Sequence, residues 1–372
     1  MKSDFNLDFL YFGQFSYNDN IALDNRFSQA GNNYQKKILS MLNIKSAYTI
    51  YPYFIRSNNN FMKHERVPVI YTRTFLPDTL HKLYRIIFDN LKIIFRSINH
   101  KEKNILFYNV EYYNILSILF LSKFTSKNNF IIIADFPFYK NSLYSRFAKF
   151  VIKNCRGIIS LNSNIRVHEN SFVLSGLIQE SKIQKFDNTL FNKNTLLSGS
   201  LGPITGLELA LDTFSQLPEH NLFISGRPFR MTQHEFDELI STYSKYPNIK
   251  YLGLLSEVKY LELLDNCSIA LSLRNPSSAE HDYNFPSKIL EYLSVGKYVI
   301  STIEYPDLPR DLIFYSRYDV ECLRNKIIEL CSLENESLEK HSEFVYEYVR
   351  KNFTEFKLRH IVKSLMENAQ TP

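Results

Sequence analysis

Short apolar runs alternate with segments of helical periodicity along most of the chain, and no other sequence feature restricts the possible folds as strongly. The chain contains only 10 glycines, and four of them directly follow such a run: Gly13, Gly199, Gly226 and Gly253. A glycine at the end of an apolar run is typical of a strand-to-loop turn. Strands that alternate with helices predict repeated βα units and a parallel sheet.

The strand candidates fall into two series. In the first half they are 9–12, 47–50, 67–71, 105–108, 130–134, 157–161 and 171–174. In the second half they are 195–198, 221–225, 249–252, 269–272, 298–301 and 312–314. A chain of 372 residues exceeds the size of one hydrophobic core. We therefore predict two doubly wound α/β domains.

The predicted domains cover residues 1–180 and 190–345, with a polar link between them. The last helical segment is interrupted near residues 352–354, and its end, about residues 350–370, could pack back on the first domain. Ligands of doubly wound sheets bind beyond the carboxyl ends of the strands. The cleft between the two domains is therefore the expected active site.

Composition excludes several classes of protein. Hydrophobic residues make up 45% and charged residues 22% of the chain, as in soluble globular proteins. The 4 cysteines are too scattered for a disulfide framework or a metal site. No signal peptide and no apolar run of roughly 20 residues is seen. A net charge of +6 is too small and dispersed for a nucleic-acid binder. We expect a cytoplasmic protein.

The segment 274–297 carries the strongest functional signal. It follows a strand candidate and contains a short helix, for which Pro286 suits the first position and Gly296 the residue just past the end. Free N–H groups at this helix start, together with Lys288, form a natural site for a diphosphate. Glu291 lies one turn further on the same face and can accept hydrogen bonds from sugar hydroxyls. The alternative is a capped surface helix with an intrahelical Lys–Glu pair.

Residues 285–297, with Phe-Pro-Ser-Lys followed by Glu-Tyr and Gly-Lys, resemble the donor-binding segment of glycosyltransferase family 4 and its bacterial polysaccharide branch. The resemblance spans roughly residues 195–309. It includes 197–201, 223–226 and 247–253, which are similar to the family's earlier nucleotide-side motifs. The resemblance implies the GT-B fold, in which two Rossmann-like domains face each other across a cleft, and an enzyme that transfers sugars.

The resemblance also implies roles for individual residues. Glu291 would bind the ribose of the nucleotide, and Glu280 would contact the donor sugar, with Asp282 as an alternative. The other donor-binding residues would be Gly13, Ser198, Gly199, Gly226, Arg227, Arg274, Phe285, Pro286, Ser287 and Lys288. GT-B enzymes generally need no bound metal, so we expect neither a metal nor a cofactor besides the nucleotide sugar.

The sequence departs from the family pattern in two places. Neither Glu280 nor Asp282 stands seven residues before Glu291, where Tyr283 lies instead. The basic pair that many members use against the phosphates is replaced by Ser200 and Thr205. Positive charge must then come from other side chains, for which Arg227, Arg230 and Arg274 are the candidates, although each could be an ordinary surface arginine.

In the first half, three candidates follow from their positions at strand and helix ends. Asp135 ends an apolar run, where a carboxylate can assist proton transfer from an acceptor hydroxyl, or simply cap the next helix. Asn32 and Asn33 open a helix and resemble acceptor-facing residues, although a helix cap explains Asn32 equally well.

Residues 81–101 form an amphipathic helix with five basic residues. Two interpretations stay open. The helix could lie on an anionic bilayer, or it could face the core and expose a charged outer surface, which is the commoner arrangement.

Together these features predict a hexosyltransferase, with retention of configuration as the usual outcome of the family. The donor would be a nucleotide diphosphate sugar, and the acceptor a growing, lipid-linked bacterial surface glycan such as O-antigen, capsule or exopolysaccharide. The enzyme would be cytoplasmic, with peripheral attachment to the inner face of the plasma membrane as a further expectation. The alternatives are a nucleotide-sugar epimerase of the same fold and a catalytically silent GT-B partner protein.

Overall fold

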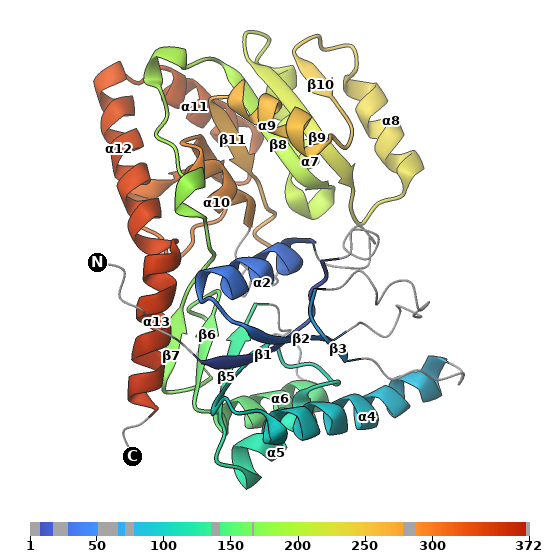
Figure 1. Ribbon diagram of the computed structural model, residues 1–372. Coiled ribbons are helices and arrows are strands. Elements are labelled where there is room, and N and C mark those ends of the chain that lie inside the picture. The colour runs from blue at the N-terminus through green and yellow to red at the C-terminus, as the bar shows by residue number, and fades with distance from the viewer. Residues whose placement is uncertain are drawn as a thin grey trace. The chain divides into compact units, whose positions relative to one another are not determined.

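A computed structural model describes residues 8–17, 29–50, 66–70, 78–134, 142–165, 167–277 and 287–369. The chain divides into two compact units (Figure 1). The first unit comprises Met1–Leu177 together with Glu355–Pro372, and the second comprises Ile178–Thr354. The final helix therefore belongs to the first unit, although it follows the second in sequence.

The first unit is built around a parallel sheet with the strand order β3-β2-β1-β4-β5-β6-β7. Its elements are β1 (Phe9–Gly13), α2 (Gln29–Met41), β2 (Ser46–Ile50), β3 (Val69–Ile70), α4 (Asp78–Asn99), β4 (Asn104–Tyr108), α5 (Ile115–Phe124), β5 (Asn128–Ile133), α6 (Leu143–Lys153), β6 (Gly157–Ser160), β7 (Ser171–Val173) and α13 (Glu355–Asn368).

The second unit is built around a parallel sheet with the strand order β10-β9-β8-β11-β12-β13. Its elements are β8 (Asn194–Leu201), α7 (Leu207–Ser215), β9 (Asn221–Pro228), α8 (Gln233–Tyr243), β10 (Ile249–Tyr251), α9 (Glu257–Asp265), β11 (Ile269–Ser272), α10 (Ser287–Ser294), β12 (Tyr298–Ser301), β13 (Phe314–Tyr315), α11 (Val320–Cys331) and α12 (Asn335–Asn352). Short 3₁₀ turns cover Glu180–Lys182, Asn188–Leu190, Pro203–Thr205 and Arg310–Leu312.

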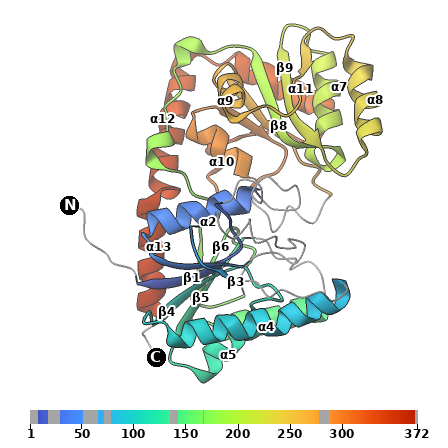
Figure 2. The same cartoon turned by 45° about the vertical axis from the view of Figure 1, so that its right-hand side comes forward.

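Helices cover both faces of each sheet, so the buried parts of the central strands are mostly apolar. In the first unit, α4, α5 and α6 lie together on one face of the sheet, while α2 lies on the other (Figures 1 and 2). α13 contacts α2, β6 and β7. The two parallel sheets with helices on both faces confirm the predicted pair of doubly wound, Rossmann-like folds.

The predicted strands and helices agree with the structure apart from their ends. The strand expected at 67–71 is confined to Val69–Ile70 within the described residues, and the one expected at 312–314 begins two residues later, at Phe314. The interruption near 352–354 separates α12 from α13. No helix in the described residues is long and apolar enough to cross a membrane.

The interpretation of residues 81–101 as a core-facing helix with a charged outer surface is wrong. The corresponding helix, α4, turns polar side chains inward: Arg85, Asp89, Asn90 and Ser97 are all buried. Its solvent side carries large apolar side chains, among them Leu91 and Phe95. Arg85, Asp89 and Asn90 have partners inside the unit, so the inward face of α4 is mainly polar, with Ile93 buried among these side chains.

Candidate functional site

The predicted donor segment lies in the second unit, where α10 begins at Ser287 in the described chain. Its far end is set by Gly296, whose φ is +73°. A Cβ atom on Gly296 would lie 2.5 Å from the backbone nitrogen of Phe186, so only glycine fits there. The helix is thereby held in place at the end opposite to its N–H groups, and Lys288 and Glu291 occupy its first two turns.

Two glycines lie opposite each other on neighbouring strands near this helix. Gly199 on β8 and Gly226 on β9 are paired in register and have φ values of +115° and +153°. A Cβ atom on Gly226 would come within 1.9 Å of the Gly199 carbonyl oxygen. A Cβ atom on Gly199 would face the side chain of Lys288, with Cε 3.9 Å away. Gly226 is buried and makes room for the Gly199 backbone, so Gly199 alone offers an open backbone surface next to the lysine, as a close-lying ligand would need.

Lys288 is held by three groups at once. Its Nζ lies 2.5 Å from Glu291 Oε2, in an ion pair whose side chains are 35% and 37% exposed. The same ammonium donates to the Tyr260 hydroxyl at 3.0 Å and lies 4.2 Å from the centre of the Tyr260 ring. A phosphate could replace the carboxylate here without any change in the helix, because both groups are anionic acceptors.

Ser198 connects the end of β8 to this group of side chains. Its Oγ lies 3.2 Å from the Tyr260 hydroxyl and 2.9 Å from the Tyr292 hydroxyl. Burial raises the pKa of both tyrosines, and the Glu291 charge raises the pKa of Tyr260 further. Both phenols therefore stay protonated at neutral pH and can donate hydrogen bonds.

Sequence reasoning missed Tyr260 and did not assign a role to Tyr292. Tyr292 could have been found, since it directly follows Glu291 in the quoted motif. Tyr260 lies on α9, 28 residues before Lys288, in a segment without any recognisable motif. Only the packing of α9 against α10 brings its hydroxyl to the lysine.

Arg274 follows β11 and is fixed through its backbone. Its N–H donates to Thr302 Oγ1 at 2.8 Å, and that hydroxyl donates to the Arg274 carbonyl at 2.8 Å. The Arg274 charge lowers the pKa of the buried Tyr305, against the larger opposite effect of burial. The Arg274 side chain is partly exposed just beyond the end of β11, and its role at the donor stays a prediction.

The other two candidate arginines are surface residues. Arg227 is exposed near the end of β9, where it pairs in register with Ser200. Arg230 is exposed, with its guanidinium carbon 5.2 Å from the ring centre of Phe229. Thr205, which replaces one of the family's basic residues, uses its hydroxyl locally, because it accepts from the Gly202 N–H at 2.8 Å.

In the first unit, Gly13 and Asn32 belong to a tightly packed strand end. A Cβ atom on Gly13 would lie 2.1 Å from Gln35 Oε1, and that oxygen accepts from the Tyr11 hydroxyl at 3.0 Å and the Gln14 N–H at 2.9 Å. Asn32 is 3% exposed, and its Oδ1 accepts from the Ser16 N–H at 2.8 Å. Gln35 and Asn32 therefore shape the loop after β1.

Asn33 differs from its neighbour, since its side chain is exposed. Four predicted site residues, Asp135, Glu280, Phe285 and Pro286, lie outside the described residues. Their roles stay predictions. Among the residues that the structure describes, no group of three or more His, Cys, Asp or Glu side chains is placed to hold a metal ion.

Comparison with known proteins identifies the fold. No protein-family model matches the chain, and no curated protein matches it in sequence. Solved structures do match over nearly the full length of both chains, at low identity. A glycosyltransferase from Rickettsia africae has a TM-score of 0.68 at 14% identity, covering 99% of this chain and 100% of that chain.

Two further matches are the N-terminal domain of Candida albicans trehalose-6-phosphate phosphatase and the lipopolysaccharide outer core galactosyltransferase WaaB. The first has a TM-score of 0.71 at 12% identity and covers 97% of this chain and 99% of that chain. The second has a TM-score of 0.60 at 12% identity and covers 96% of this chain and 99% of that chain. With two Rossmann-like parallel sheets and these structural neighbours, the chain has the GT-B fold.

Proposed function

We propose that this protein is a glycosyltransferase that moves a hexose from a nucleotide diphosphate sugar to a hydroxyl group of a growing glycan. The observation that carries the proposal is the position of Lys288, at the start of α10 and beside the backbone of Gly199, because its pair with Glu291 alone would also form on an ordinary surface helix. One cation and one carboxylate at a helix start match the two polar parts of a nucleotide donor, its diphosphate and its ribose.

Donor binding would separate the two partners of this pair. The diphosphate takes the place of the carboxylate at Lys288 Nζ, and Glu291 becomes available to accept hydrogen bonds from the ribose hydroxyls. Tyr260 holds the lysine during the exchange, since its hydroxyl accepts from Nζ at 3.0 Å. No charge is left without a partner in either state.

Catalysis would come mainly from stabilising the diphosphate as it leaves the sugar. Negative charge develops on it as the bond to the sugar breaks, and Lys288 and the N–H groups at the start of α10 would stabilise that charge. Arg274 is the proposed additional cation. Asp135 and Glu280 stay proposed as the acids near the reacting sugar, and retention of configuration is the expected outcome.

The proposed acceptor is a lipid-linked bacterial surface glycan such as O-antigen, capsule or exopolysaccharide. Support comes from the resemblance of residues 195–309 to bacterial polysaccharide enzymes and from the fold shared with a lipopolysaccharide galactosyltransferase. An enzyme with this acceptor would work at the inner face of the plasma membrane.

A donor screen tests the proposal. UDP-, GDP- and dTDP-sugars are compared for their ability to raise the melting temperature, and Glu291→Gln is then measured with the best donor. The matched control is Glu329→Gln, because Glu329 forms an equivalent i,i+3 pair with Lys326, at 2.6 Å on α11. We expect sugars of one nucleotide class to raise the melting temperature. Glu291→Gln should reduce that increase, and Glu329→Gln should not. A chain that no donor stabilises would contradict the proposal.

Two other functions remain as alternatives, and both are testable with the same donor. An epimerase of this fold would convert the donor sugar without any acceptor. A catalytically silent GT-B protein is favoured by one observation, the replacement of the expected basic pair by Ser200 and Thr205. Unchanged glycan synthesis in cells carrying Glu291→Ala would support the silent protein.

A further inference from the structure

Helix α4 packs with Arg85, Asp89 and Asn90 inward, and hydrogen bonds to the chain around α5 keep it in this orientation. Arg85 and Asp89 form an ion pair with N–O distances of 2.6 and 2.7 Å, and their side chains are 4% and 0% exposed. Asn90 donates to the Tyr112 carbonyl at 2.9 Å and accepts from the Ser117 N–H at 2.8 Å. Rotating the helix would break both bonds of Asn90 to the chain around α5 and leave the buried Ser117 N–H without its acceptor, whereas the Arg85–Asp89 pair would turn with the helix.

The opposite face of α4 presents a continuous apolar stripe to solvent. Leu83, Ile87, Leu91, Phe95 and Ile98 recur every three or four residues and are 46–65% exposed. That spacing places them on one side of a helix. Scattered exposed apolar residues are ordinary, but a stripe along a 22-residue helix is not.

The neighbouring helices extend this stripe into a surface. α5 contacts α4, and α6 contacts α5, on the same face of the first sheet (Figure 1). Phe120 and Phe124 of α5 are exposed, with ring centres 5.3 Å apart, and Leu143 and Phe150 of α6 are exposed as well. Of the 21 large apolar side chains that are exposed in the described residues, 12 belong to these three helices. So many exposed apolar side chains on three neighbouring helices are unusual for a surface that faces water alone.

The charges around this surface are mostly positive. Within residues 78–134 and 142–156 the acids are Asp78, Asp89, Glu102 and Glu111. Asp89 and Glu102 are buried, and Glu111 is partly buried. Many basic side chains of the same residues are exposed, among them Lys92, Arg96, Lys101, Lys123, Arg146 and Lys153. The exposed charge of the three-helix surface is therefore positive.

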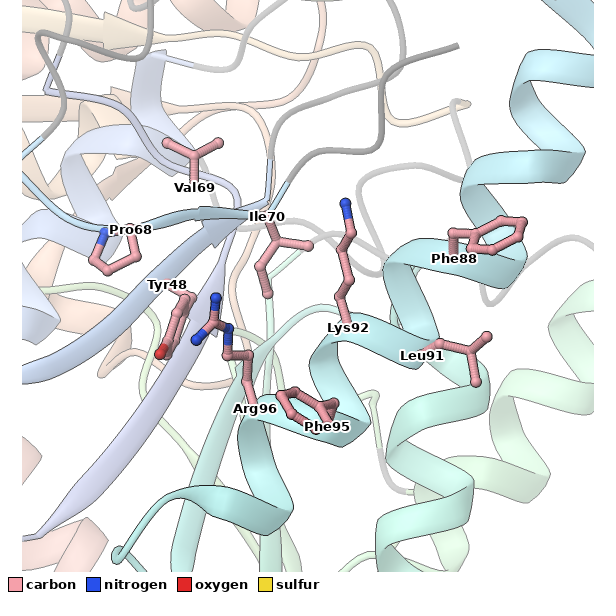
Figure 3. A pocket seen from close by; sticks show the side chains of 9 residues that line it. All are labelled: Tyr48, Pro68, Val69, Ile70, Phe88, Leu91, Lys92, Phe95 and Arg96. Atoms are coloured by element: carbon pink, nitrogen blue, oxygen red, sulfur yellow. The ribbon is translucent and has the colours of Figure 1, made fainter.

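Basic and apolar side chains meet at a cavity of about 360 Å³ between α4 and the edge formed by β2 and β3. Figure 3 shows Lys92 and Arg96 reaching from α4 toward Ile70 and Tyr48. The guanidinium carbon of Arg96 lies 5.8 Å from the centre of the Tyr48 ring. Leu91 and Phe95 line the same cavity. A phosphate headgroup would meet the two cations here, while the attached chains would meet apolar side chains.

We propose that the face formed by α4, α5 and α6 docks on a lipid bilayer that contains anionic phospholipid, with α4 lying parallel to the membrane surface. Apolar side chains would enter the boundary of the acyl region, and the basic side chains would contact the headgroups. A second copy of the chain is a poorer occupant, because a two-fold contact would set one positive surface against another. This inference is independent of the donor site.

Vesicle binding tests the proposal directly. The full chain is sedimented with vesicles of phosphatidylcholine alone and with vesicles of equimolar phosphatidylcholine and phosphatidylglycerol. We expect binding to the anionic vesicles only, weakened by added salt. The double variant Leu91→Ser/Phe95→Ser should bind at least about tenfold more weakly. The affinity of the Lys92→Gln/Arg96→Gln variant for anionic vesicles should fall about fivefold for each charge removed.

Matched variants control for general effects on the surface. Ile328→Ser/Phe356→Ser removes exposed apolar side chains from α11 and α13, and Lys245→Gln/Lys351→Gln removes exposed charges from outside the three helices. Both should bind vesicles like the unmodified chain. Thermal stabilisation by a nucleotide sugar, measured without vesicles, should be the same for all these variants, so failure of docking and failure of the donor proposal are distinguishable.

Three results would overturn the proposal. One is an unmodified chain that binds neither kind of vesicle. Another is equal binding by the Leu91/Phe95 variant and its control. The third is an unmodified chain that is dimeric in solution while the Leu91/Phe95 variant is monomeric, which would make the surface an interface between protein chains.

Discussion

Replacing Lys288 with alanine separates a functional cation from a merely structural one. In the structure, Lys288 pairs with Glu291 at 2.5 Å and lies 4.2 Å from the centre of the Tyr260 ring. If the lysine serves only the helix, Lys288→Ala should change stability and little else. If it binds the donor diphosphate, the change should be larger in ligand affinity than in stability.

The two effects differ in size. The pair is i,i+3 on one helix with both side chains more than a third exposed, so its loss costs about 0.3–0.5 kcal/mol of unfolding free energy. Loss of the contact with the Tyr260 ring adds about 0.5–1 kcal/mol. A hydrogen bond to a charged phosphate contributes about 1.5–3 kcal/mol, which corresponds to about a tenfold to hundredfold change in Kd.

Calorimetric titration with the best donor nucleotide, beside urea unfolding, measures both quantities. The control is Lys326→Ala, because Lys326 and Glu329 form an i,i+3 pair of the same kind on α11, at 2.6 Å. Both variants should unfold at slightly lower urea concentration, and only Lys288→Ala should lose donor affinity. Equal nucleotide affinity of the two variants would refute the assignment of Lys288 to the diphosphate.

Three further predictions concern the site and its support. Tyr260→Phe removes the hydroxyl that accepts from Lys288 and should weaken donor binding about twofold to tenfold, whereas Tyr243→Phe, which removes a hydroxyl bonded to Asp212 on the surface, should leave titrations unchanged. Gly226→Ala should lower the urea-unfolding free energy by at least about 2 kcal/mol, because its Cβ would lie 1.9 Å from the Gly199 carbonyl oxygen. Gly253 has a φ of +69° with open space around it, so Gly253→Ala should lower the unfolding free energy by only about 1 kcal/mol. Equal losses of unfolding free energy in the two glycine variants would contradict this account. Burial beside Tyr298 and Phe314 lowers the pKa of His341 to about 4. As pH drops from about 6.5 towards 4, His341 is therefore protonated in the unfolded chain but not in the folded one, and the free energy of unfolding should fall. His341→Phe should flatten that limb of the pH–stability curve, and an unchanged limb would exclude His341 as its source.

The sequence by itself determined the order of strands and helices, because that order depends on local patterns. Short apolar runs marked the strands of both sheets, although Gly199 and Gly226, which were expected at strand-to-loop turns, lie inside β8 and β9. Gly296 marked the end of α10 through the backbone conformation that only glycine adopts easily. The spacing of Lys288 and Glu291 likewise placed them on one face of a helix, and they form an ion pair there.

Only the tertiary structure decided which distant residues meet. Tyr260 reaches Lys288 from another helix, and Gln35 fills the space beside Gly13 from α2; neither contact has a local signal in the sequence. The orientation of α4 is the clearest case. Its periodicity is visible in the sequence, but the inward face is set by the partners of Asn90, which are the Tyr112 carbonyl and the Ser117 N–H at the start of α5. A helical pattern defines two faces, and packing decides which of them meets water.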